Sequence, residues 1–215
     1  MDLLSEEEQW ELVKRWLREN GPSIVVGVVV ALLAVAGWRW WQARGEQNEV
    51  AAVAAYEKIL QTFDAGKTDE ALAQIELLRK EHPRSGYVDS ADLAAARVFV
   101  ARNTLDQAVE RLERVTTSAN DEQLRPIARL RLARVQAAQG KHDLALTTLG
   151  TADMGAHQAA YVETRGDILL SKGDRAGALA EYEKARKLQP VDSTGTGVAA
   201  LLDLKIDDLR PAAAP

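Results

Sequence analysis

The side chains best suited to metal binding or catalysis are few and scattered in this sequence. It has 3 histidines, His82, His142 and His157, and no cysteine. Each histidine stands in or beside an expected turn, without a second metal-binding residue four positions further on. The lack of cysteine excludes disulfides, thiolate metal sites and thiol nucleophiles. We therefore expect no metal site, no cofactor and no catalytic residue.

Neighbouring carboxylates occur, but their positions favour surface charge over general acid–base chemistry. Asp69-Glu70 and Asp207-Asp208 fall near the ends of expected helices, where charges commonly interact with the helix dipole. The chain carries 27 Lys and Arg against 32 Asp and Glu, a net charge of −5, which does not suggest a nucleic-acid-binding protein. The sequence thus predicts a protein that is not an enzyme and that does not bind nucleic acid.

The composition favours helices almost everywhere. Alanine, leucine, arginine and glutamate are abundant, and runs of β-branched residues occur only in one apolar stretch near the N-terminus. We therefore expect an all-α protein.

A longer periodicity organises the chain after about residue 45. Four segments share a layout in which a turn residue is followed five positions later by alanine, and four positions after that by an apolar or aromatic residue. Both series step by 37, 37 and 33 residues. The turn residues are Gly66, Asn103, Gly140 and Gly173, the alanines are Ala71, Ala108, Ala145 and Ala178, and the third positions are Ile75, Leu112, Leu149 and Tyr182.

This layout predicts helical hairpins that stack on one another. Glycine and asparagine accept the left-handed backbone of a tight turn, and small residues let two helices cross closely. Each hairpin leaves an apolar face that only a neighbouring hairpin buries. The spacing resembles the tetratricopeptide repeat, best in the last copy, where Gly166 takes the close-crossing position and Pro190 closes the unit. The resemblance implies an α-solenoid of about four hairpins, and the alternative is a generic antiparallel bundle.

An uncharged run near the N-terminus is the second organising element. Asn20 to Trp38 contains no charged side chain, and Gly21 to Trp41 contains only Arg39. A helix of roughly 20 apolar residues crosses the hydrocarbon core of a bilayer. Three tryptophans at the end of the run are typical of a membrane interface, and no polar stripe marks one face of a soluble helix. We therefore expect a single transmembrane helix rather than a buried core helix.

Two features bear on how this anchor is processed and oriented. Ala34-Val35-Ala36 has the form of a signal-peptidase site, so cleavage before Gly37 is the alternative to a retained anchor. Retention is favoured because the segment before the run is long and rich in acids. The distribution of basic residues favours a cytoplasmic N-terminus and an exported C-terminal part, with Lys14, Arg15 and Arg18 before the run and Arg39 and Arg44 after it.

These elements predict a division of the chain into four parts. The expected parts are a cytoplasmic amphipathic helix at 1–20, a transmembrane anchor at 21–41, a tetratricopeptide-like repeat domain at 42–190, and a linker, capping helix and disordered tail at 191–215. A capping box at Ser5 to Glu8 opens the first helix, and Asn20-Gly21-Pro22 is expected to end it. The capping helix is expected from Val198 to Leu209.

The first helix of each repeat predicts a protein-binding groove. In tetratricopeptide proteins these helices line the concave face, and carrying that over gives Tyr56, Leu60, Phe63, Leu93, Arg97, Leu130, Arg134, Glu163 and Asp167. Arg97 and Arg134 occupy equivalent positions one repeat apart and could receive a carboxylate of a partner. The alternative, which the usual behaviour of exposed helical charges favours, is that they pair internally with Glu163 and Asp167.

The whole chain resembles the bacterial ancillary SecYEG translocon subunit family, whose members are single-pass inner-membrane proteins with a periplasmic tetratricopeptide-like domain. The most specific part of the resemblance is the N-terminal 45 residues, above all Lys14-Arg15, Glu19-Asn20-Gly21 and Gly37-Trp38-Arg39. The likeness implies that the chain associates with the Sec translocon and with a membrane-anchored periplasmic chaperone, and that it assists exported polypeptides without enzymatic activity. The alternative is a periplasmic scaffold for envelope or respiratory complex assembly with no link to Sec.

Overall fold

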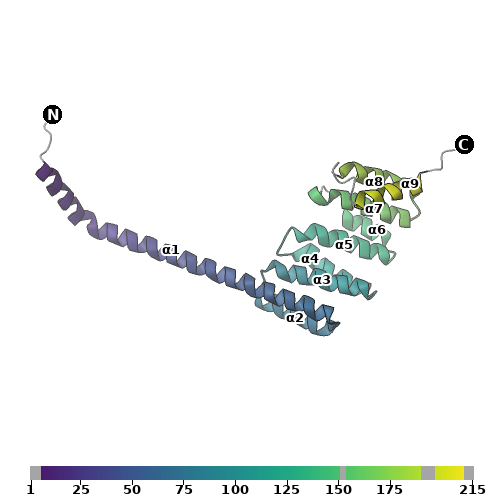
Figure 1. The fold of residues 1–215 in the computed structure, drawn as a ribbon, viewed down its shortest axis with the longest axis horizontal. Helices are drawn as coiled ribbons and strands as arrows, with labels where there is room; N and C mark the ends of the chain where they lie inside the picture. The colour runs from purple at the N-terminus through teal and green to yellow at the C-terminus, as the bar shows by residue number, and fades with distance from the viewer. Residues whose placement is uncertain (1–5, 151–153, 190–196, 211–215) are drawn as a thin grey trace, which may run out of the picture. The chain divides into compact units, whose positions relative to one another are not determined.

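Every regular element that the structure describes is helical. The computed structural model describes residues 6–150, 154–189 and 197–210 (Figure 1). The α-helices are α1 (Glu6–Asp64), α2 (Thr68–Glu81), α3 (Gly86–Ala101), α4 (Leu105–Ser118), α5 (Leu124–Ala138), α6 (His142–Leu149), α7 (Gln158–Ser171), α8 (Arg175–Leu188) and α9 (Gly197–Leu209). One 3₁₀ turn, η1 (Gly155–His157), precedes α7.

The chain forms two compact units, Met1–Ala51 and Ala52–Pro215, which we describe separately. In the first unit, the helix expected to end at Asn20-Gly21-Pro22 continues instead as part of α1. Two segments of α1, Lys14–Gly21 and Val25–Trp40, meet there at 51°. Proline donates no backbone hydrogen bond, so a bend rather than an end results. The expected capping residue Ser5 lies outside the described residues.

The apolar run of the first unit lies within these bent segments. Among the described residues, no single helix has both the length and the apolarity needed to cross a membrane, and only the bent pair Lys14–Gly21 and Val25–Trp40 reaches both together. Apolar side chains along it are exposed, for example Leu33 at 68% and Val35 at 57%.

The second unit contains the four predicted left-handed turns. Gly66, Asn103, Gly140 and Gly173 have φ angles of +77°, +59°, +76° and +86°, and each lies between the two helices of a hairpin. Asn103 is the only residue other than glycine with positive φ in the described part of the chain. The hairpins are therefore α1 (from Ala52) with α2, α3 with α4, α5 with α6, and α7 with α8, as the periodicity predicted.

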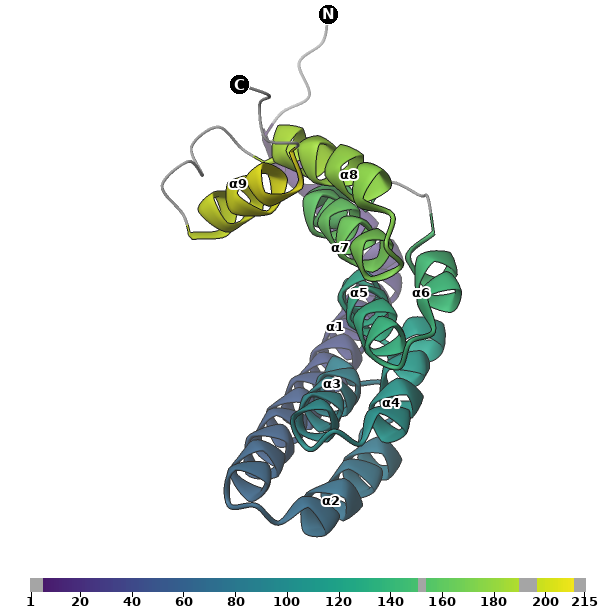
Figure 2. The same ribbon diagram turned by 90° about the vertical axis from the view of Figure 1, so that its right-hand side faces the viewer.

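The predicted small and apolar positions form the contacts between helices. Ala71, Ala108, Ala145 and Ala178 are completely buried, and the residues four positions on, Ile75, Leu112, Leu149 and Tyr182, are at most 1% exposed. Figure 2 shows the result as two rows of helices, with α3, α5 and α7 in one row and α4, α6 and α8 in the other. The repeat unit is thus a helical solenoid, and the generic bundle is excluded.

Helix α9 closes the open end of the last hairpin. It spans Gly197–Leu209, close to the capping helix that the sequence predicted. Leu202, Ile206 and Leu209 are buried against Val162 of α7 and Tyr182 of α8. A terminal helix of this kind covers an apolar face that no further repeat buries.

A buried ion network ties the second hairpin to the first. Asp92 of α3 is almost fully buried and binds Arg79 of α2 at 2.7 Å and Arg111 of α4 at 3.0 Å. Glu76 of α2 also binds both arginines, at 2.6 and 3.1 Å. Burial alone would raise the pKa of Glu76, but the hydrogen bonds and charges of the two arginines outweigh it and hold that pKa below its ordinary value. The network therefore holds three helices in one arrangement.

Gly166 marks the closest crossing of α7 and α8. A Cβ atom at this position would lie 2.6 Å from Cε1 and 2.7 Å from Cδ1 of Tyr182, and 3.3 Å from the carbonyl oxygen of Ala178. The Tyr182 ring cannot easily move aside, because it is buried and its hydroxyl donates a 2.7 Å hydrogen bond to Asp167. Gly166, which matches the close-crossing position of the tetratricopeptide repeat, is therefore required by packing.

We predict that Gly166→Ala lowers the free energy of unfolding by about 1–3 kcal/mol, because the added methyl group overpacks the crossing. Urea denaturation followed by helical circular dichroism measures this change. Gly173→Ala is the control, since a Cβ there meets nothing within 4 Å and only the left-handed backbone is strained. In the double variant with Tyr182→Leu, the cost of the alanine should shrink; an unchanged cost would contradict the crossing as the cause.

Candidate protein-binding groove

The candidate groove follows the row formed by α1, α3, α5 and α7 of the repeat unit (Figure 2). The predicted residues lie on all four helices: Tyr56, Leu60 and Phe63 on α1, Leu93 and Arg97 on α3, Leu130 and Arg134 on α5, and Glu163 and Asp167 on α7. They differ in accessibility. Phe63 and Leu93 are each only 7% exposed and pack within the core, whereas Arg97 and Arg134 are exposed.

The first part of the groove is aromatic and aliphatic. Tyr56 and Tyr87 are half-buried, with ring centroids 5.6 Å apart and the rings tilted by 39°. Leu60 is also half-buried and packs on the same core. These side chains pack against the core and are partly exposed.

The structure brings Arg97 and Arg134 together around a cavity of about 360 Å³. Ala96, Arg97 and Val100 of α3, Leu112 of α4, and Arg131, Arg134 and Val135 of α5 line it. Ala96, Leu112 and Val135 are buried and form an apolar floor, while Val100 is 44% exposed. The cavity therefore combines an apolar floor with three guanidinium groups.

These three guanidinium groups have no acidic partner within the described residues. No ion pair joins Arg97, Arg131 or Arg134 to a carboxylate in that part of the chain. Arg134 instead donates from Nε to Oγ1 of Thr164, at 3.1 Å, which fixes its direction across the neighbouring repeat. The cavity is consequently a cationic site.

The internal pairing that the sequence suggested for Arg97 and Arg134 does not occur. Glu163 and Asp167 are bound by Lys205 of α9, whose Nζ lies 2.8 Å from Glu163 Oε1 and 2.7 Å from Asp167 Oδ1. The repeat pattern could not reveal this contact, because α9 lies outside the repeats and 38 residues separate Lys205 from Asp167. The C-terminal helix thus neutralises the acids at one end of the groove.

Tyr182 and Lys205 form one cluster with these acids. The Lys205 ammonium lies 5.2 Å from the centre of the Tyr182 ring, and the Tyr182 hydroxyl donates to Asp167. Burial, helped by the hydrogen bond to Asp167, raises the pKa of Tyr182 well above its ordinary value. Burial alone would lower the pKa of Lys205, but the hydrogen bonds and charges of Asp167 and Glu163 outweigh it and raise that pKa. Both groups are therefore held in their protonated forms.

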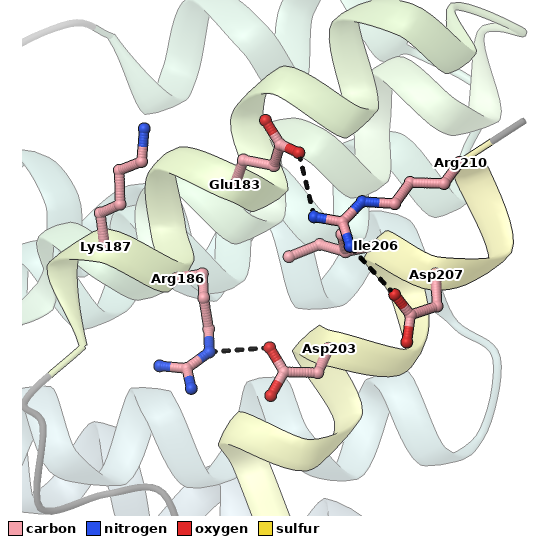
Figure 3. Close-up of a pocket in the computed structure, with 7 residues that line it drawn as sticks. All are labelled: Glu183, Arg186, Lys187, Asp203, Ile206, Asp207 and Arg210. Carbon is pink, nitrogen blue, oxygen red and sulfur yellow. Dashed lines mark hydrogen bonds and ion pairs between the residues drawn. The ribbon is translucent and has the colours of Figure 1, made fainter. Parts of the chain in front are cut away.

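A second cavity, of about 560 Å³, lies between α8 and α9 (Figure 3). Its charged side chains are largely paired with one another. Arg186 Nε lies 2.7 Å from Asp203 Oδ1, and Arg210 lies 3.4 Å from both Glu183 and Asp207. These pairs hold α9 against α8, so this cavity is mainly part of the cap.

The three histidines, which the sequence placed in or beside turns, lie at helix ends. His82 caps the C-terminus of α2, His142 begins α6 and His157 ends η1. In the ranges that the structure describes, no group of three or more histidine or acidic residues is arranged to hold a metal ion.

Sequence reasoning found two of the three arginines and missed the third. Arg131 lies one helical turn before Arg134, so i, i+3 spacing from a groove residue was the available signal. Val100 lies at the same spacing after Arg97. The floor residues carried no such signal, because buried alanine, leucine and valine occur throughout the repeats.

Comparison with known proteins agrees with this fold. A family profile described as a tetratricopeptide repeat-like domain matches residues 14–211. The chain is 33% identical to a protein of Escherichia coli strain K12 named ancillary SecYEG translocon subunit, over 95% of this chain and 97% of that protein. It is 30% identical to the protein of the same name from Aggregatibacter actinomycetemcomitans, over 96% and 98% of the two chains.

Among solved structures, one described as a functional characterisation of PilF from Pseudomonas aeruginosa is similar with a TM-score of 0.56. The match covers 75% of this chain and 68% of that one at 18% sequence identity, a level that supports the shared fold alone.

We predict that the repeat unit loses stability as the pH rises above about 10, the ordinary pKa of tyrosine. The pKa values of Tyr182 and Lys205 are higher in the folded protein than in the unfolded chain. The stabilisation that each group provides is therefore complete below its unfolded-state pKa and decreases as the pH rises from there toward its folded-state pKa. Urea midpoints measured from about pH 8 to 11 should fall less steeply in Tyr182→Phe. Tyr56→Phe, which removes a hydroxyl outside this cluster, is the control; equal slopes in both variants would contradict the assignment.

Proposed function

This chain belongs to the family of ancillary SecYEG translocon subunits, and we propose that it is a membrane-anchored, non-enzymatic interaction subunit that works beside the Sec translocon. The observation that carries this proposal is 33% identity to the Escherichia coli protein of that name across almost the full length of both chains. Because the match includes the N-terminal unit as well as the repeats, the proposal concerns the whole chain.

The repeat unit supports an interaction role. Its helices bury their apolar faces against one another and leave a row of first helices with an exposed cationic cavity. Solenoids of stacked hairpins commonly bind other proteins through such extended faces. The histidines lie at helix ends, Asp69 and Glu70 lie in the first turn of α2, and Glu70 and Asp207 form ion pairs with Lys67 and Arg210. We therefore assign the chain no catalytic residue.

The N-terminal unit is proposed to be the membrane anchor. Its support comes from the uncharged run Asn20 to Trp38, the exposed apolar side chains along it, and the tryptophans at its end. We propose a single pass with the N-terminus in the cytoplasm and the repeat unit in the periplasm of a bacterial inner membrane. The excess of basic residues before the run supports this orientation.

In this proposal, the anchor holds the repeat groove close to the translocation channel. A groove tethered next to the channel meets emerging polypeptides at a far higher effective concentration than a free protein in the same compartment. We propose that exported polypeptides, and a membrane-anchored periplasmic chaperone that receives them, are its partners. The second candidate is a scaffold for envelope or respiratory complex assembly, to which the same repeat fold is suited.

Photo-crosslinking from the anchor separates these two candidates. We expect a crosslinking amino acid at Trp38 or Trp40 to capture translocon subunits, since both side chains are more than 60% exposed on α1. Mass spectrometry of the crosslinked products identifies the partners. Capture of assembly factors without translocon subunits would favour the scaffold.

Deletion of residues 1–44 tests the anchor itself. Recovery of translocon subunits with the shortened chain should fall by about two orders of magnitude, the gain expected from tethering. Undiminished recovery would show that the repeats bind the translocon without the anchor, and would contradict the proposed role of the anchor.

A further inference from the structure

We propose that the cavity between α3, α4 and α5 binds an internal segment of a partner polypeptide in which an apolar side chain is flanked by carboxylates. This inference rests on the proposed function, because it gives the chemistry of a partner for the repeat groove. The inference is based on the position of Arg97, Arg131 and Arg134, which line a cavity of about 360 Å³ together with apolar side chains.

The floor accounts for the apolar side chain. Ala96, Leu112 and Val135, which are 2%, 1% and 6% exposed, have aliphatic side chains, so they offer the cavity base no polar atom. Val100 stands at the cavity with 44% of its surface exposed. An aliphatic or aromatic side chain placed here removes its own surface and that of Val100 from water, which is favourable in proportion to the area buried.

The three arginines account for the carboxylates. A guanidinium group has a planar set of donors that matches a carboxylate, and such charge-assisted pairs are among the stronger hydrogen bonds. No acid lines the cavity, and three acids of α3 and α7 are bound elsewhere: Asp92 by Arg79 and Arg111, and Glu163 and Asp167 by Lys205. A partner therefore has to supply the missing negative charge.

The cavity between α8 and α9 (Figure 3) differs in how its charges are paired. There, arginines on α8 and α9 face Asp203, Asp207 and Glu183 of the same chain and form ion pairs with them. In the cavity between α3, α4 and α5, the lining residues include three arginines and no acid. The arginines of the α8/α9 cavity are paired with acids of the same chain, whereas the arginines of the α3/α4/α5 cavity form no ion pair within the described residues.

The spread of the arginines favours an internal segment over a chain end. Arg97 stands on α3, and Arg131 and Arg134 stand on successive turns of α5. A single C-terminal carboxylate pairs with the guanidinium group of one arginine. Three arginines on two helices therefore favour a partner segment with more than one carboxylate. A polyanion such as nucleic acid is disfavoured, since the chain as a whole carries a charge of −5.

Fluorescence anisotropy with defined peptides tests the proposal, using the full-length chain in mild detergent. The probe is a labelled, C-terminally amidated peptide with leucine between glutamates. Replacing its glutamates with glutamine, or its leucine with serine, should each weaken binding at least about tenfold, the scale of a lost charge-assisted contact or buried side chain. The glutamine peptide with a free C-terminal carboxylate should remain weak.

Variants of the protein provide the matching test. Arg97→Gln and Arg131→Gln should each weaken binding of the acidic peptide about tenfold, and binding should weaken with salt. Val100→Asp should abolish binding by placing a carboxylate among the arginines. The controls are Arg84→Gln, which removes an exposed arginine from the turn before α3, and Leu144→Asp on α6, and both should bind as the unaltered chain does.

The proposal is overturned if the acidic and glutamine peptides bind alike, if only the free carboxylate matters, or if Arg84→Gln weakens binding as much as Arg97→Gln. Inorganic phosphate that displaces the peptide at equal concentration would also overturn it, as a general anion site. Crosslinking from Trp38 tests the proposed function independently of the peptide experiment. Translocon capture without peptide binding would refute this inference alone, whereas absence of translocon capture would refute the proposed function.

Discussion

The repeat unit depends on close crossing between the two helices of each hairpin. At Gly166 there is no room for a single methyl group against Tyr182, and Ala71, Ala108, Ala145 and Ala178 make the equivalent approach possible in all four hairpins. A left-handed residue between the helices directs the second helix back along the first. Since each hairpin then presents an apolar face to the next, the stack and its terminal cap α9 follow from this one constraint.

The same stacking creates the cationic cavity. Equivalent positions on successive first helices lie next to one another in the solenoid, so Arg97 and the Arg131–Arg134 pair meet although more than thirty residues separate them. Helix α9 supplies Lys205 to the acids of α7, and within the described residues the three arginines form no ion pair with a carboxylate.

The sequence was most informative where a residue type is required by backbone geometry or close packing. Gly66, Asn103, Gly140 and Gly173 were predicted as left-handed turns and are so, and the four alanines were predicted and found at the crossings. It was less informative where one chain element meets another outside the repeat. The Lys205 contacts and the apolar cavity floor depend on tertiary placement. The continuation of α1 past Pro22 could not be read from Asn20-Gly21-Pro22, because a proline can bend a helix as well as end it. Phe63 and Leu93 show the same limit, because period alone does not separate a groove position from a core position.

In the proposed function, the chain contacts its polypeptide partners through the row of first helices, at the cavity between α3, α4 and α5. The most direct measurement is photo-crosslinking in intact cells from Val100, which is exposed at the cavity, compared with Leu144, which is exposed to a similar extent on α6. We expect a crosslinker at Val100 to capture polypeptide partners and one at Leu144 to capture few. Equal capture from both positions, or stronger capture from Leu144, would contradict it.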